Sequence, residues 1–298
     1  MQDSKGKQLK ALINAAEILV TPGIYDGFSA RFVEHCGFNT ASISGAGTSE
    51  SRLGWADRGI LGFEENLRNA RAIADCCNLL LQADIDTGYG NAINVYFVVR
   101  AFEKAGMAAI MIEDQVWPKR CGHMAGKQVI SAEEMVQKVK AACDARQDPA
   151  TVIKARTDAA APLGVDEAIR RLNLYAEAGA DCLFADALMT VEDIEKVAKN
   201  VPKPLSVNMG LGFLTRKTTP LLTPKQLQAL GVAQVSYPRM LSTAALKGMQ
   251  NVMRVFQDEV LGQDKLSPRP DLVATFEDLN DMMGLPFLDE LERRYAVN

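Results

Sequence analysis

The chain has 298 residues, of which 48% are hydrophobic and 23% are charged, which suits a globular protein with one large core or two modest ones. The formal net charge of -4 gives no electrostatic reason for binding nucleic acid or an anionic membrane. No run approaches the about 20 apolar residues that cross a bilayer, and MQDSKGKQLK lacks the apolar core of a secretory signal, so we expect a cytoplasmic protein.

Four segments share one pattern, in which a helical stretch ends in small residues and glycine and is soon followed by a short apolar run. These segments are 32–45, 102–114, 175–186 and 227–238. Glycine is the usual C-terminal cap of a helix, and an apolar run without alternation fits a strand buried on both faces. The pattern predicts repeated β/α units with parallel strands.

Extending the pattern predicts eight strands, each followed by a helical segment. In chain order they are 18–23, 40–44, 79–85, 108–113, 151–156, 182–186, 204–208 and 234–237. This alternation favours a closed (β/α)8 TIM-type barrel over an open sheet, and SAEE predicts a capped helix over 131–146. No linker rich in Pro, Gly or Ser divides the chain, so we expect a single barrel domain over 1–298, with 257–298 as a C-terminal helical extension.

The predicted strand ends carry an unusual number of carboxylates. In chain order these ends hold Asp26, Ser44 with Gly45, Asp84 with Asp86, Glu113 with Asp114, Arg156 with Asp158, Asp186, Asn208 and Tyr237. Each acid could simply be solvated, but acids that converge on a barrel mouth repel one another unless a cation neutralises them. Oxygen ligands favour Mg2+, with Mn2+ as a substitute. Because residues two apart on a strand face the same way, Asp84 and Asp86 are expected to approach one ion.

The segment 117–127 predicts a reactive loop, because it gathers three cations, a histidine and a cysteine. Lys119 and Arg120 favour the thiolate of Cys121, which could therefore exchange a proton near neutral pH. The alternative is a solvated basic turn. Arg156 could clamp a substrate carboxylate with its planar fork, or it could simply pair with Asp158. The six cysteines lack C-x-x-C spacing, and with two histidines a zinc site is not indicated.

From about residue 10 to 240 the sequence resembles the isocitrate lyase and phosphoenolpyruvate mutase superfamily. The matching motifs are Tyr25-Asp26-Gly27-x-Ser29-Ala30, Ser44-Gly45, Asp84-x-Asp86-x-Gly88-Tyr89-Gly90, Glu113-Asp114-Gln115, Pro118-Lys119-Arg120-Cys121-Gly122-His123, Arg156-Thr157-Asp158 and Asn208. The resemblance implies a β/α barrel whose last helix is exchanged with a neighbouring subunit, usually in a homotetramer built as a dimer of dimers. The C-terminal extension would serve that exchange.

The resemblance also implies roles for individual residues. Asp84 would ligate Mg2+, and the acids that hold the ion directly or through water would be Asp57, Asp86 and Glu113. The pyruvate-like half of the substrate would lie against Ser44, Gly45 and Arg156. The departing half would face Arg120, Gly122, His123 and Asn208. The remaining implied substrate contacts are Tyr25, Asp26, Lys119 and Asp186. The loop with Cys121 would close over the site, and Cys121 would protonate a carbanion.

The implied reaction is Mg2+-dependent cleavage of a 2-hydroxy dicarboxylate or tricarboxylate, of the 2,3-dimethylmalate or 2-methylisocitrate type, to pyruvate and a carboxylic acid. The alternatives are a carboxyphosphonoenolpyruvate phosphonomutase, an oxaloacetate hydrolase or decarboxylase, and a barrel that only binds. The expected partner is a small 2-hydroxy or 2-oxo acid, with no nucleic acid and no membrane.

Three departures from the superfamily bear on the substrate. Ser42 stands where methylisocitrate lyases have a tyrosine, and Asp186 stands where a glutamate is usual. The segment after Asn208 is longer, which places Arg216 and Lys217 on a wall of the pocket or on its rim. These changes lie mainly beside the departing half. An apolar, shortened pocket would suit 2,3-dimethylmalate better than 2-methylisocitrate.

Overall fold

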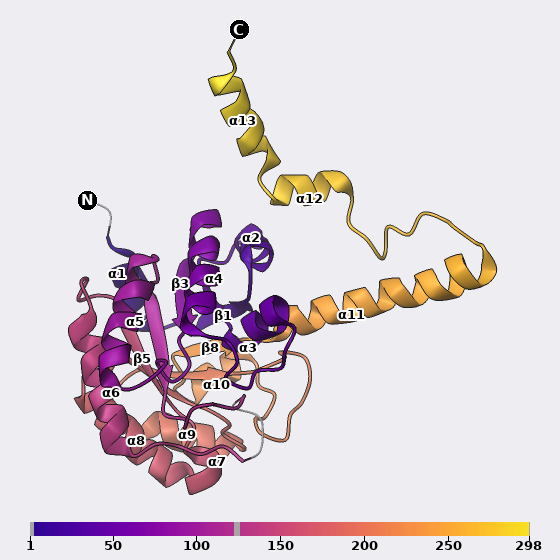
Figure 1. Ribbon diagram of the computed structural model, residues 1–298. Helices are drawn as coiled ribbons and strands as arrows, with labels where there is room; N and C mark the ends of the chain where they lie inside the picture. Colours follow the sequence, from indigo (N-terminus) through magenta and orange to yellow (C-terminus); the bar gives the residue numbers. More distant parts are fainter. Residues whose placement is uncertain (1–2, 122–125, 298) are drawn as a thin grey trace.

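The computed structural model describes residues 3–121 and 126–297, so the predicted site residues Gly122 and His123 lie outside it. Eight parallel strands form a closed barrel in which β8 pairs with β1 (Figure 1). They are β1 (Leu19–Ile24), β2 (Thr40–Ile43), β3 (Leu80–Asp84), β4 (Ala109–Glu113), β5 (Val152–Thr157), β6 (Cys182–Ala185), β7 (Leu205–Asn208) and β8 (Gln234–Tyr237). The predicted barrel is confirmed, and each predicted strand boundary lies within one residue of the observed one.

Helices connect the strands and cover the outside of the barrel. They are α1 (Lys5–Ile13), α2 (Gly27–His35), α3 (Gly45–Thr48), α4 (Phe63–Cys76), α5 (Ala92–Lys104), α6 (Ala132–Ala145), α7 (Ala160–Leu163), α8 (Val165–Glu177), α9 (Val191–Lys199) and α10 (Pro224–Ala229), with the π-helix η1 (Ser49–Leu53). The predicted cap of α6 is present, since Ser131 Oγ accepts a hydrogen bond of 3.1 Å from Glu134 N. Side chains of strands and helices form the apolar core between the two layers.

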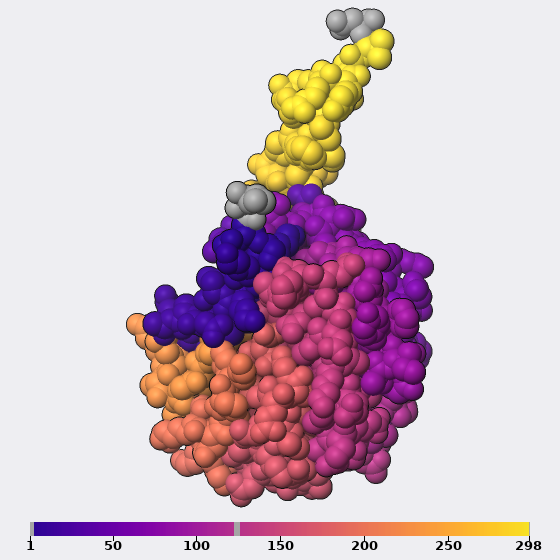
Figure 2. Space-filling view, turned by 90° about the vertical axis from the view of Figure 1, so that its left-hand side faces the viewer, coloured from indigo at the N-terminus to yellow at the C-terminus, as the bar shows by residue number. Residues whose placement is uncertain are grey.

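The segment after β8 leaves the barrel. Its helices are α11 (Met240–Val255), the π-helix η2 (Phe256–Leu261), α12 (Phe276–Met282) and α13 (Leu285–Tyr295). Figures 1 and 2 show this C-terminal arm projecting from the barrel. No residue in 240–297, all of which the structure describes, is buried, and the exposed apolar side chains of the arm include Leu246, Met249, Met253, Phe276 and Phe287. The projection begins with α11, upstream of residue 257.

Within the described part of the chain, no helix is both long and apolar enough to cross a membrane.

Candidate active site

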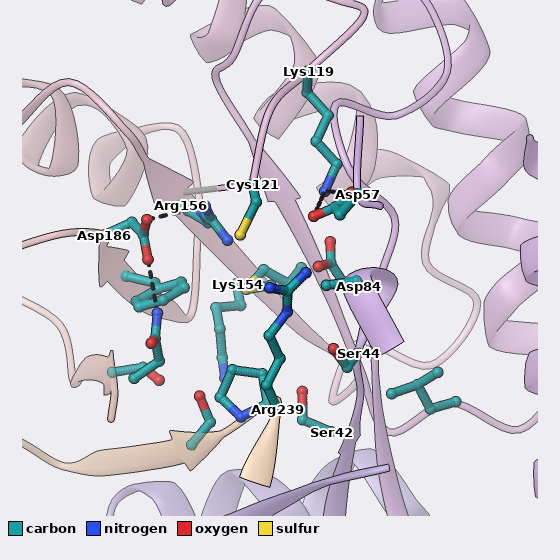
Figure 3. Close-up of a pocket in the computed structure, with 18 of the residues that line it drawn as sticks. Ser42, Ser44, Asp57, Asp84, Lys119, Cys121, Lys154, Arg156, Asp186 and Arg239 are labelled. Atoms are coloured by element: carbon teal, nitrogen blue, oxygen red, sulfur yellow. Dashed lines mark hydrogen bonds and ion pairs between the residues drawn. The ribbon is translucent and has the colours of Figure 1, made fainter. Parts of the chain in front are cut away.

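A cavity opens at the end of the barrel where the strands finish (Figure 3). It is lined by several of the residues predicted from the sequence, namely Ser44, Asp57, Asp84, Lys119, Cys121, Arg156, Asp186 and Asn208. These residues come from distant parts of the chain and meet because parallel strands bring their carboxyl ends to one edge. The structure therefore assembles the core of the predicted site.

One wall of the cavity is acidic and encloses the ammonium group of Lys119. Lys119 Nζ lies 2.8 Å from Asp57 Oδ1 and 2.7 Å from Asp86 Oδ1, and its side chain is buried. Burial alone would lower the pKa of Lys119, but Asp86, Glu113 and Asp57 raise it well above its ordinary value. Burial raises the pKa of Asp86 to about 7 against the opposing attraction of Lys119. Lys119 thus partly neutralises the acids that were expected to hold a metal.

Asp84 and Asp86 do approach one point, but not for the predicted reason. Asp86 lies beyond the end of β3 in the left-handed region, with φ of 50°, so strand alternation does not set its direction. Its backbone N–H instead donates to Asp84 Oδ1 at 2.9 Å. A Cβ atom at Gly45 would lie 3.2 Å from Asp84 Oδ2 and 3.3 Å from Asp86 Oδ1, so glycine allows close approach of the backbone to both carboxylates.

Glu113 stands behind this wall at the end of β4, and neither Glu113 nor Asp86 lines the cavity itself. Glu113 is buried, and its nearest cation is Arg156, whose Nε lies 3.1 Å from Glu113 Oε2. No described residue donates a hydrogen bond to either carboxylate oxygen, and burial raises the pKa of Glu113 well above its ordinary value. Buried oxygens without a donor fit a site for a cation or its bound water.

The four acids are nevertheless not placed so that all of them could bind one ion directly. Among residues 3–121 and 126–297, no three His, Cys, Asp or Glu side chains are grouped so that they could hold one ion. Joint direct coordination by Asp57, Asp84, Asp86 and Glu113 is therefore not the observed arrangement. Mg2+ commonly binds through one or two carboxylates and keeps several waters, and oxygen donors spaced in this way fit that mode.

Arg156 is heavily engaged by acids of the protein. Its Nε and Nη2 donate to Asp158 at 2.8 and 2.9 Å, and Nη2 lies 3.2 Å from Asp186. Lys127 Nζ lies 2.8 Å from the same Asp158. The alternative in which Arg156 pairs with Asp158 is thus the observed one. No described residue hydrogen-bonds to Nη1, which leaves that edge of the guanidinium for a ligand at the cavity.

Asp186 and Asn208 form a fixed polar pair across from the acidic wall. Asn208 Nδ2 donates to Asp186 Oδ1 at 2.7 Å, and Gly210 N donates to Asn208 Oδ1 at 3.1 Å. Although Asp186 is a methylene shorter than glutamate, Asn208 and Arg156 hold it at the cavity surface.

Within the described part of the loop, Lys119, Cys121 and Lys127 are buried, whereas Trp117, Pro118 and Gly126 are exposed. Cys121 lines the cavity with only 8% of its surface exposed, and its backbone N–H donates to Asp57 O at 3.2 Å. In Figure 3 its sulfur points into the cavity, between Arg156 and Asp57. Gln115 fixes the loop by accepting from Arg120 N at 3.0 Å and donating to Arg120 O at 2.9 Å. The alternative of a solvated basic turn is wrong for Lys119, Cys121 and Lys127, which are all buried.

Four of the described substrate contacts implied by the resemblance do not line the cavity: Tyr25, Asp26, Gly45 and Arg120. Asp26 caps α2, accepting a hydrogen bond of 2.8 Å from Ser29 N. Tyr25 packs beside Gly47 of α3, where a Cβ atom would lie 2.9 Å from the Tyr25 Cβ. In this structure Tyr25 and Asp26 therefore support the turn that presents Ser44.

Sequence reasoning missed several polar residues that line the cavity: Lys154, Ser206, Ser236 and Arg239. Lys154 Nζ donates to Gln82 Oε1 at 2.9 Å and to Gln234 Oε1 at 2.6 Å, and burial lowers its pKa. A usable signal was present, because Lys154 and Ser206 stand two residues before Arg156 and Asn208 and so face the same way. The expected apolar lining beside the departing half is not found, because Arg216 and Arg239 lie there.

The family model for phosphoenolpyruvate phosphomutase matches residues 9–257. The chain is 38% identical over 290 residues to 2,3-dimethylmalate lyase of Eubacterium barkeri, covering 97% of this chain and 98% of the relative. It is 38% identical over 279 residues to 2-methylisocitrate lyase of Aeropyrum pernix, covering 94% and 87%. The structure of phosphonopyruvate hydrolase with oxalate and Mg2+ matches with a TM-score of 0.86 and 30% identity, covering 98% and 99%. The chain belongs to the phosphoenolpyruvate phosphomutase family, within the phosphoenolpyruvate mutase/isocitrate lyase superfamily that its motifs predicted.

Proposed function

We propose that the protein is a carbon-carbon lyase that cleaves a 2-hydroxy dicarboxylate or tricarboxylate to pyruvate and a carboxylic acid. The observation that carries this proposal is the convergence of Asp84, Arg156 and the Cys121 thiol on one cavity. A cation site, an anion clamp and a proton donor are what such a cleavage needs. The lyases among its relatives support the same reaction type.

The acidic wall would hold Mg2+, or Mn2+ in its place, through Asp84 and through waters that Asp57, Asp86 and Glu113 bind. When bound, the ion supplies a Lewis acid to the oxygens of the pyruvyl half. Ser44 and the backbone at Gly45 lie beside Asp84, where they would position this half. The open Nη1 edge of Arg156 would accept its carboxylate.

Cleavage begins when the substrate hydroxyl transfers its proton to a water molecule that enters the cavity, and solvent later returns a proton to the Cys121 thiolate. The electron pair of the C2–C3 bond then moves onto C3 and its attached carboxylate, while C2 becomes the carbonyl carbon of pyruvate. Asn208 lies at the cavity surface, where its amide would orient the departing carboxylate. The thiol of Cys121 would then transfer its proton to C3, releasing the carboxylic acid. Arg120 would reach the substrate only after the loop moves.

We also propose a homo-oligomer, built as a dimer of dimers, in which the C-terminal arm packs on a neighbouring subunit. The exposed apolar residues of α11, such as Leu246, Met249 and Met253, support this assembly because such side chains favour burial. A groove beside β1 and α10, lined in part by Ile18, Val20 and Pro224, offers an apolar surface on the barrel. All six cysteines are free thiols, which favours a reducing compartment such as the cytoplasm.

The first test is release of a 2-oxo acid, measured with Mg2+ and again with excess chelator. The product would be pyruvate from 2,3-dimethylmalate, 2-methylisocitrate or oxaloacetate, and glyoxylate from isocitrate, which lacks the 2-methyl group. Proton NMR would identify the coproducts. We expect chelator-sensitive pyruvate together with a carboxylic acid from at least one hydroxy acid. Cys121→Ser should lower this rate strongly, because a serine hydroxyl is a much weaker acid than a thiol. Absence of the expected 2-oxo acid from every compound would reject the lyase proposal for these substrates.

A carbon-phosphorus mutase is the second candidate, and the similarity to phosphonopyruvate hydrolase favours it over a barrel that only binds. Phosphorus NMR with a phosphonate substrate separates the two activities, because only phosphorus chemistry would change the phosphorus signal. Oxaloacetate cleavage, the third candidate, would appear in the same panel as acetate and oxalate, or as pyruvate and carbon dioxide.

A further inference from the structure

Two arginines, Arg216 and Arg239, follow the last two strands of the barrel. Arg216 comes from the connection between β7 and α10, and Arg239 is the second residue after β8. Both side chains line the cavity. Figure 3 shows Arg239 rising from the end of β8 into the cavity, with its guanidinium directed toward the level of Asp84 and Cys121.

Gly210 contacts both arginines and helps to hold them in position. Its carbonyl accepts a hydrogen bond of 3.2 Å from Arg239 N, which fixes the backbone that carries Arg239. A Cβ atom at position 210 would clash with all three terminal atoms of the Arg216 guanidinium, so this group lies directly against the glycine. Gly210 also has a φ of 55°, which other residues adopt at a cost. The position of Arg216 therefore depends on a glycine here.

The positive charge of these two arginines is only partly compensated, because Arg239 has a carboxylate partner and Arg216 has none among the described residues. No carboxylate in the described ranges lies within ion-pairing distance of Arg216, and burial, with Arg239 adding repulsion, lowers the pKa of Arg216. Arg239 pairs with Glu50 through Nη2, yet its Nε is buried without a hydrogen-bond partner among described residues. Lys154, which also lines the cavity, donates to two amide oxygens rather than to a carboxylate. Cations gathered in this way are stabilised by an anion that enters the cavity.

We propose that Arg216 and Arg239 form a second anion-binding subsite, which takes an acidic group carried by the departing half of the substrate. This inference rests on the proposed lyase function, in which the pyruvyl half occupies the acidic wall. The subsite would favour a substrate whose C3 bears a carboxymethyl or similarly acidic substituent, as in 2-methylisocitrate. A substrate with a methyl group there, such as 2,3-dimethylmalate, would leave both guanidiniums without an anion.

The first experiment compares kcat/KM for 2-methylisocitrate and 2,3-dimethylmalate, which differ at this substituent. We expect the wild type to favour the tricarboxylate by about 100-fold, and Arg216→Met or Arg239→Met to lower its kcat/KM by about 10- to 100-fold. The same variants should change kcat/KM for 2,3-dimethylmalate by less than about 3-fold. An equal loss for both substrates, or a wild type that favours 2,3-dimethylmalate, would overturn the subsite.

Two further variants make this test specific. Lys217→Met removes an exposed positive charge from the next residue, which does not line the cavity, and should leave both kcat/KM values within about 2-fold of wild type. Gly210→Ala should reproduce the selective loss of Arg216→Met, because the added methyl group displaces the guanidinium. A selective effect of Lys217→Met equal to that of Arg216→Met would assign the preference to long-range charge and reject the subsite.

A binding experiment separates this inference from the proposed reaction, because it needs no turnover. Calorimetry would compare succinate and propionate, the two departing acids, with 3-phosphonopropionate as a phosphonate analogue of succinate. We expect succinate to bind at least about 10-fold tighter than propionate, with the difference lost in Arg216→Met. Tighter binding of the phosphonate would keep the subsite and identify a phosphonate as its group. Equal binding of succinate and propionate would reject the subsite even if the enzyme releases pyruvate.

Discussion

Glu113 and Asp114 are consecutive acids at the end of β4, equally buried, and the structure treats them in opposite ways. Asp114 accepts four hydrogen bonds, from Thr157 Oγ1 at 2.7 Å, Tyr175 OH at 2.7 Å, Arg171 Nη1 at 3.1 Å and Asp158 N at 2.9 Å. No described residue donates to either oxygen of Glu113. Because neighbouring side chains at a strand end point to opposite faces, Asp114 meets α8 while Glu113 meets the barrel interior.

Asp114 uses its carboxylate to hold the fold together, whereas Glu113 has the open acceptor oxygens that the proposed cation site needs. Buried carboxylates normally find donors within the protein, since an unmade hydrogen bond to a buried group is costly. Asp114 fulfils this rule by joining β4, β5 and α8. Glu113 departs from it beside Asp84, where a hydrated cation would supply the missing partners. Satisfaction of hydrogen bonds, rather than burial, therefore separates Asp114 from the acid that we propose for the cation site.

The largest effect is expected for Asp114→Ala. Removing this carboxylate takes away the buried partner of Arg171, which keeps only the surface acid Glu167, and breaks the bonds from Thr157 and Tyr175. We therefore expect a loss of about 3–5 kcal/mol in the free energy of unfolding. Urea denaturation at fixed protein concentration would measure it. Asp166→Ala, at an exposed acid that pairs with Lys196, is the matched control and should cost less than about 1 kcal/mol. Equal effects of the two substitutions would remove the structural role of Asp114.

Glu113→Gln should change the Mg2+ dependence of activity without lowering the stability of the protein. We expect the Mg2+ concentration for half-maximal pyruvate release to rise by about 10- to 100-fold, because an acceptor of a metal-bound water becomes weaker. Without Mg2+, the variant should be at least as stable as the wild type, since a buried carboxylate without hydrogen bonds is replaced by a neutral amide. A Mg2+ titration of activity and a urea titration of the metal-free protein check the two parts. An unchanged Mg2+ dependence would place the ion away from Glu113.

Tyr175→Phe sharpens the comparison by removing a single donor from Asp114. The hydroxyl makes a buried hydrogen bond of 2.7 Å to a carboxylate, and its loss should cost about 1.5–3 kcal/mol. Steady-state kinetics should be unchanged, because Tyr175 does not line the cavity. Tyr96→Phe is the control, since the hydroxyl of Tyr96 makes no hydrogen bond to a described residue. A fall in kcat for Tyr175→Phe would show that the Asp114 network also positions the site.

The sequence predicted the strands closely because their apolar runs are buried on both faces and end at turns. It also brought Asp84 and Arg156 into one site, since strand ends must meet at the barrel mouth, and the family resemblance added Lys119 and Cys121. It could not separate Glu113 from Asp114, because their partners lie on distant elements such as α8. The path of the connection after β7 likewise had no local pattern, so the sequence placed Arg216 only on a wall or rim and did not single out Arg239.

The smallest effect on the free energy of unfolding is expected at Glu167, the surface acid that pairs with the same Arg171 as Asp114. Arg171 Nε donates to Glu167 Oε1 at 2.8 Å, and Arg170 Nε donates to Oε2 at 2.7 Å. The hydrogen bond from Arg170, with help from Arg171, lowers the pKa of Glu167 to about 2 from its ordinary 4.5. Because the folded pKa is the lower one, its stabilisation is complete above about pH 4.5 and is lost as the pH falls toward 2.

Glu167→Gln should therefore cost under about 1 kcal/mol at pH 7, a small value because water screens the partly exposed pair. Urea midpoints of wild type and variant, compared between pH 6 and pH 3, should converge as the pH falls. A difference that stayed constant would mean that the charge of Glu167 contributes nothing, and that Asp114 alone fixes Arg171. Midpoints that converge at low pH would instead show that the ionised Glu167 stabilises the fold through Arg171. Arg171 would then link two acids of unequal effect, a small one from Glu167 at the surface and a large one from the buried Asp114.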